Sequence, residues 1–106
     1  MMYSEEDDEE QDDLEAFIAE RAKTDPEFPA RVEARVRKRL LIHALAAKRE
    51  ELGISQKELA KRLEMTPAAV ARLERGEADP KLSLLTRFAA ALGQELELRL
   101  KEKAPA

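Results

Sequence analysis

The stretch that most constrains the fold runs from Ser55 to Arg75, SQKELAKRLEMTPAAVARLER. Ser55 is followed three residues later by Glu58, which is a capping box: each side chain satisfies a free backbone N–H group of the other residue. Thr66 can cap the next helix, and Pro67 suits its first position because proline lacks an N–H group and has a nearly helical φ. The sequence therefore predicts two short helices joined by a tight turn.

A longer pattern surrounds this pair of helices. Its residues are Gln56, Glu58-Leu59-Ala60, Val70, Leu73-Glu74, Gly76 and the run LTRFAAALG that ends at Gly93. With this spacing, residues 41–100 resemble the XRE, or Cro/C1-type, helix-turn-helix family. Family members usually have glycine in the turn where this chain has Glu64, and a positive φ at that residue would cost on the order of 1 kcal/mol. We expect an all-α fold, a five-helix helix-turn-helix domain with an N-terminal helical arm and a C-terminal β-strand.

Charge is distributed unevenly along the chain, whose net charge is −4. Residues 1–30 carry 12 acidic and 2 basic side chains, whereas residues 31–106 carry 11 acidic and 17 basic ones. Such asymmetry is typical of a basic binding module with an acidic tail. The acidic total therefore does not exclude a nucleic-acid partner.

The composition argues against an enzyme and against a cofactor. With no cysteine and a single histidine, the chain can assemble neither a plausible metal site nor a nucleophile, base and orienting residue. No apolar run reaches the ~18 residues of a membrane helix, and the N-terminus is acidic where a signal peptide would be basic. We expect no membrane partner and a cytoplasmic protein that joins the nucleoid when it binds DNA.

The N-terminal part of the chain is predicted to form an arm. Leu14, Phe17 and Ile18 recur at helical spacing after the acidic run, and Phe28 follows a break in the helical pattern. The predicted parts are a disordered acidic tail (1–13), an amphipathic helix and corner that bind a partner (14–29), and a helix-turn-helix DNA-binding and dimerisation domain (30–106).

The C-terminal residues alternate as a β-strand does. Leu96, Leu98 and Leu100 fall on one face, and charged residues fall on the other. No second strand is predicted, and a lone strand would leave its backbone groups without partners. We expect the same strand of a second copy to pair with it in a homodimer, and the alternative is an unpaired extended arm.

Membership in the helix-turn-helix family implies that the second helix reads the major groove of double-stranded DNA. The resemblance places groove-facing residues at Thr66, Pro67, Ala68 and Arg72 and a phosphate contact at Gln56. Arg72 can bond bidentately to guanine O6 and N7. Further phosphate contacts are expected at Lys57, Arg75 and Lys81, and the alternative for each is a solvated charge without a partner.

The helix, corner and long helix of the N-terminal part, with the DPEF run at residues 25–28, resemble HigA-type antitoxins. This resemblance implies a protein that represses its own operon and neutralises a small, basic RelE/HigB-like ribonuclease toxin. Leu14, Phe17, Ile18 and Phe28 would then bind the toxin. The alternatives are a free-standing XRE-family repressor and a protein-interaction adaptor, and the arm could instead fold back on its own chain or cover its own DNA-binding face.

Overall fold

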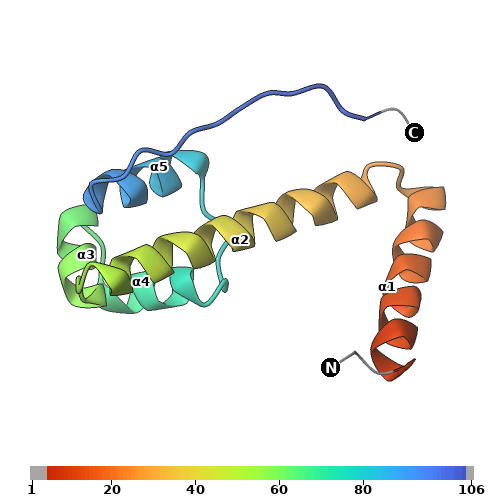
Figure 1. Cartoon of the computed structure of the whole chain (residues 1–106), viewed down its shortest axis with the longest axis horizontal. Helices are drawn as coiled ribbons and strands as arrows, with labels where there is room; N and C mark the ends of the chain where they lie inside the picture. The colour runs from red at the N-terminus through yellow and green to blue at the C-terminus, as the bar shows by residue number, and fades with distance from the viewer. Residues whose placement is uncertain (1–4, 105–106) are drawn as a thin grey trace. The chain divides into compact units, whose positions relative to one another are not determined.

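The computed structural model describes residues 5–104 and, among side chains, those of residues 13–104. Five α-helices follow one another in this part of the chain, as Figure 1 shows. They are α1 (Glu5–Thr24), α2 (Phe28–Glu51), α3 (Gln56–Leu63), α4 (Pro67–Glu74) and α5 (Leu82–Ala91). The chain divides into two compact units, residues 1–38 and residues 39–106, and the boundary falls within α2.

The N-terminal unit (residues 1–38) contains α1, a short corner and the first turns of α2. The corner is closed by two backbone hydrogen bonds, from Asp25 N to Arg21 O at 2.8 Å and from Phe28 N to Asp25 O at 3.0 Å. Helix α1 begins at Glu5, so it includes acidic residues for which the sequence predicted disorder. Acidic residues in the first turns of a helix interact favourably with its macrodipole, which opposes the charge repulsion on which the prediction of disorder rested. Residues 1–4 of the predicted tail lie outside the described residues.

The C-terminal unit (residues 39–106) is built around one hydrophobic core. Helix α3 packs against both α4 and α5, and Phe88 of α5 is the largest fully buried side chain. The buried apolar residues are Ile42, Leu45, Leu59, Ala60, Leu63, Val70, Leu73, Leu85, Phe88, Ala89 and Leu92. The all-α fold and the helix-turn-helix domain that the sequence predicted are thus confirmed.

The turn between α3 and α4 is closed at Glu64, which adopts the left-handed conformation with φ 56° and ψ 44°. Two backbone hydrogen bonds close the end of α3, from Glu64 N to Lys61 O at 3.3 Å and from Met65 N to Ala60 O at 2.8 Å. Glu64 is the one non-glycine residue with positive φ in the described part of the chain. Glu64 therefore has the positive φ that was considered for this position, at a cost on the order of 1 kcal/mol.

The predicted C-terminal strand is not formed in this single chain. Residues 94–104 have neither helical nor strand structure, and no β-strand occurs among residues 5–104. Leu96 packs against the core, whereas Leu98 and Leu100 are 64% and 101% exposed. A strand needs a ladder of hydrogen bonds with a second strand, and the described residues supply none.

Candidate nucleic-acid interface

Both helices of the pair begin with a side-chain cap, and at α3 the structure shows one of the two hydrogen bonds of the predicted capping box. Ser55 Oγ accepts a hydrogen bond from Glu58 N at 3.0 Å, and Thr66 Oγ1 accepts one from Ala69 N at 3.0 Å. The Glu58 carboxylate lies 3.4 Å from Arg62 Nε, so its side chain pairs with the next turn of α3. Pro67 occupies the start of α4, as expected. These caps fix where α4 begins and hence which of its side chains reach the surface.

The predicted groove-facing residues all lie on the surface of α4 and its cap. Thr66, Pro67 and Ala68 are exposed at the start of the helix, and Arg72 is exposed one turn later. Three side chains without long extensions precede one long cation, so another surface can approach the start of α4 closely. The Thr66 hydroxyl is occupied as an acceptor but can still donate its own hydrogen.

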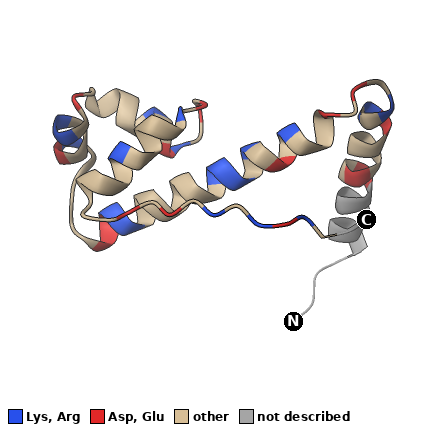
Figure 2. Cartoon of the chain, turned by 90° about the horizontal axis from the view of Figure 1, so that it is seen from above, with Lys and Arg blue, Asp and Glu red and all other residues tan. Residues whose placement is uncertain are grey.

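The predicted phosphate contacts have different surroundings. Lys57 and Lys81 are exposed, and Arg75 is exposed but donates a hydrogen bond from Nε to Glu77 Oε2. Gln56 is half-buried, and its Nε2 donates to Glu74 Oε1 at 2.9 Å. Figure 2 shows that Lys and Arg are distributed over several helices of the C-terminal unit and do not form a single block.

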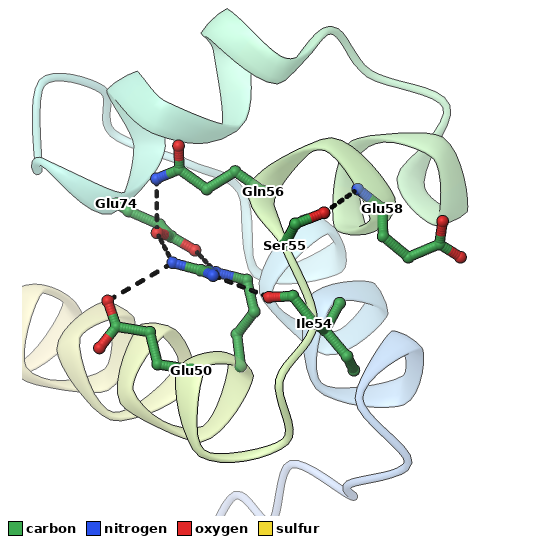
Figure 3. Close-up of polar contacts among 7 residues, drawn as sticks. Glu50, Ile54, Ser55, Gln56, Glu58 and Glu74 are labelled. Atoms are coloured by element: carbon green, nitrogen blue, oxygen red, sulfur yellow. Dashed lines mark hydrogen bonds and ion pairs between the residues drawn. The ribbon is translucent and has the colours of Figure 1, made fainter.

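A buried ion pair joins α2 to α4, and a hydrogen bond from Gln56 joins α3 to the same pair. Arg49 binds Glu74 through two hydrogen bonds, Nε to Oε2 at 2.7 Å and Nη2 to Oε1 at 2.8 Å (Figure 3). Its remaining terminal nitrogen donates to Ile54 O at 2.8 Å, and Gln56 completes the set on the same carboxylate. The two charged side chains are 9% and 8% exposed. Arg49 lies in α2, Gln56 begins α3 and Glu74 ends α4, so this network fixes the last turn of α4 against α2 and α3.

The protonation state of Glu74 follows from this network. Burial alone would raise the pKa of the Glu74 carboxyl. The hydrogen bonds from Arg49 and Gln56, together with the charge of Arg49, lower this pKa by more than burial raises it, so it lies below the ordinary value of 4.5. Glu74 is therefore an anion at neutral pH, and it holds the Gln56 amide in one orientation. This network was not predicted from the sequence. The signal was an arginine one turn after Leu45, where the buried face of α2 continues.

Two arginines, Arg62 and Arg87, hold the turn before α4. Arg62 of α3 donates from Nη1 to Ala91 O at the end of α5, at 2.7 Å. Arg87 of α5 donates in return from Nη2 to Leu63 O at the end of α3, at 2.9 Å. Each guanidinium thus satisfies a carbonyl that has no partner within its own helix. The exchange ties α5 to the turn that leads into α4.

The predicted partner-binding residues lie in the N-terminal unit. Leu14 and Phe17 are 59% and 53% exposed, and Ile18 and Phe28 are half-buried. Phe17 and Phe28 meet edge to face with ring centroids 6.0 Å apart, and Arg21 Cζ lies 5.0 Å from the centre of the Phe28 ring. The corner therefore presents two aromatic rings, one of them largely open to solvent.

The class of the protein follows from two short, capped helices, α3 and α4, of which the second has an exposed N-terminus. The family model described as helix-turn-helix matches residues 45–98, and the chain belongs to this XRE-type helix-turn-helix family. The chain is thus a non-enzymatic, helix-turn-helix DNA-binding protein. No helix in the described part of the chain combines the length and apolar character needed to span a membrane.

Within this family the chain is related to antitoxins and to transcriptional regulators. Antitoxin HigA1 of Mycobacterium tuberculosis is 41% identical over 90 residues, which are 85% of this chain and 60% of the antitoxin. An uncharacterized HTH-type transcriptional regulator of Methanothermobacter thermautotrophicus is 47% identical over 47 residues, 44% of this chain and 68% of its own length. A regulator of the same description from Haemophilus influenzae is 38% identical over 58 residues, 55% of this chain and 59% of its own length. No solved structure matches significantly.

Proposed function

We propose that this chain is a sequence-specific DNA-binding antitoxin that represses its own operon and neutralises a small, basic ribonuclease of the RelE/HigB type. The observation that supports the DNA-binding part is that α4 is held in place at both ends while its outer face is exposed. Its N-terminus is capped by Thr66, its last turn is fixed by the buried Arg49–Glu74 pair, and its outer face is exposed. A helix held at both ends presents its side chains to a groove at little entropic cost on binding.

In the proposed complex, α4 lies in the major groove and α3 crosses the phosphate backbone. Arg72 provides the main direct contact to a base, because a guanidinium matches the O6 and N7 acceptors of guanine. Pro67 and Ala68 can add only apolar contacts, for example to thymine methyl groups. Gln56, held by Glu74, retains one amide N–H for a phosphate, and Lys57, Arg75 and Lys81 add further phosphate contacts.

We expect the Arg72→Ala variant to bind operator DNA more weakly by about 1–3 kcal/mol and random DNA almost as well as the wild type. Lys81→Ala should instead weaken binding to both duplexes equally and reduce the salt dependence by about one phosphate contact. Fluorescence anisotropy on the two duplexes measures both effects. Arg37→Ala, an exposed arginine of the N-terminal unit, is the control. An equal loss on both duplexes for Arg72→Ala would make that residue a phosphate contact.

The antitoxin part of the proposal is supported by the N-terminal unit. The similarity between this chain and antitoxin HigA1 extends well beyond the helix-turn-helix residues 45–98, since it covers 85% of the chain. The exposed Phe17 and Leu14 provide apolar anchors, and the acidic excess of residues 1–30 attracts a basic partner. The chain spans only about 60% of the length of HigA1, so the toxin partner is a proposal for this chain.

We also propose a homodimer in which residues 94–101 of two copies pair as antiparallel strands. The exposed Leu98 and Leu100 would be covered by the second copy, and Glu and Arg or Lys would face each other across the ladder. Two-fold pairing also suits a helix-turn-helix protein, because it sets the spacing of two operator half-sites. The number of chains bound per duplex tests this part of the proposal.

A free-standing repressor is the second candidate. The two HTH-type transcriptional regulators match only 44% and 55% of the chain, so their similarity does not require the N-terminal arm to have a partner. In that case the arm regulates solubility or DNA binding. The discriminating observation is the presence or absence of a small, basic ribonuclease bound to the full chain.

A further inference from the structure

The loop after α4 folds back on the helix. Gly76 has φ +75°, its N–H donates to Leu73 O at 3.0 Å, and the N–H of Glu77 donates to Arg72 O at 3.1 Å. This is the Schellman arrangement, which reverses the chain at the end of a helix. Residues two apart in a continuing helix do not face each other, but the reversal brings Glu77 back beside Arg75.

Glu77 thereby binds a residue that is predicted to contact DNA. Arg75 Nε donates a hydrogen bond to Glu77 Oε2, and the two side chains are 58% and 50% exposed. The hydrogen bond from Arg75 holds the pKa of Glu77 below its usual value, and the charge of Arg72 acts in the same direction. The carboxylate is therefore an anion at neutral pH, close to two cations of the proposed DNA-binding surface.

The backbone that places Glu77 is fixed from the other side by α2. A Cβ atom at Gly76 would lie 2.7 Å from Arg39 Nε, so the Arg39 guanidinium covers this glycine. Its Nη2 also lies 3.5 Å from Arg75 O at the end of α4. The positive φ favours glycine at residue 76, and the two backbone hydrogen bonds of the Schellman arrangement hold the backbone that carries Glu77.

We propose that Glu77 sets the DNA affinity of this surface by competing with a backbone phosphate of DNA for Arg75. This inference rests on the proposed DNA binding. A carboxylate and a phosphate are both anionic acceptors for a guanidinium, so Arg75 must exchange one for the other when DNA binds. The exchange reduces the net gain from the contact and makes the complex easier to dissociate.

The test is a double-mutant cycle with Glu77→Gln, Arg75→Ala and the double variant. The probe is a fluorescent random-sequence duplex of about two helical turns, titrated at several salt concentrations so that phosphate binding is measured without an operator. With Arg75 present, Glu77→Gln should raise the affinity about three- to tenfold at low salt and steepen the salt dependence by about one phosphate contact. In the Arg75→Ala background the same change should alter the affinity less than about twofold.

Glu33→Gln is the matched control, because Glu33 also forms an exposed ion pair with an arginine, Arg37, and the variant loses the same charge. It should leave the affinity unchanged. An equal gain from Glu77→Gln in both backgrounds would overturn the inference, since Glu77 would then act as a general negative charge; no gain in either would overturn it as well. A wild-type chain without salt-dependent DNA binding would contradict the proposed function itself.

Discussion

Replacing Arg49 by methionine is expected to lower the free energy of unfolding by about 3–5 kcal/mol. The change leaves the Glu74 carboxylate buried without its charged partner, and it also removes the hydrogen bond to Ile54 O. The cost arises mainly from the unpaired anion, so the double variant Arg49→Met/Glu74→Leu should recover most of the lost stability. Urea denaturation of the three proteins measures these differences.

Arg37→Met is the control for this experiment, because its ion pair with Glu33 is exposed and should contribute less than about 1 kcal/mol. A loss below this limit for Arg49→Met would contradict the role of the pair.

The pH dependence gives a second check. In the wild type, the pKa of Glu74 is lowered, so its contribution is complete above the ordinary value of 4.5 and is lost as the pH falls through the folded-state pKa. In Arg49→Met, burial raises the pKa of Glu74, and acid should restore part of the stability.

The second large effect is expected at the corner where Phe17 meets Phe28, the proposed partner-binding site. Phe17→Ala removes the more exposed ring of the edge-to-face pair with Phe28, and aromatic anchors of this kind typically contribute 2 kcal/mol or more to binding. We therefore expect the variant to inhibit the proposed ribonuclease partner with a potency lower by about 30-fold. The measurement is the concentration of this chain that halves RNA cleavage by a small, basic ribonuclease that co-purifies with the full chain.

Val36→Ala is the matched control for Phe17→Ala, because Val36 is also exposed in the N-terminal unit but was not predicted to bind a partner. It should inhibit as well as the wild type. Inhibition that is unchanged by Phe17→Ala would move the site away from this corner. If the full chain, isolated from its own cells, has no small, basic ribonuclease bound to it, a free-standing repressor becomes the better account.

Local signals predicted most of the helix-turn-helix domain. The Ser55 and Thr66 caps set the starts of α3 and α4. The core was indicated by the spacing of Leu59 and Leu63 in one helix and, separately, of Leu85 and Phe88 in another. These features depend on residues within a turn or two of each other. The sequence therefore contains them in a form that can be recognised without the fold.

The features that the sequence did not predict correctly depend on contacts between distant residues. Arg49 and Glu74 are 25 residues apart, and nothing local to either one identifies its partner. Gln56 was predicted to be a phosphate contact, but its hydrogen bond to the Glu74 carboxylate could be recognised only in the folded structure. The predicted C-terminal strand is not formed by residues 94–104, because the described part of the chain offers no second strand to supply the hydrogen bonds of a ladder.

Native mass spectrometry tests the central claim, a dimer that binds its own operator, most directly. The full chain is mixed with a duplex from the DNA upstream of its gene, in the presence of excess random duplex of a different mass. We predict that two chains, or a multiple of two, bind the upstream duplex and that the complex dissociates as ionic strength rises. A single bound chain would contradict the dimer, and equal occupancy of both duplexes, or no complex at all, would contradict operator recognition.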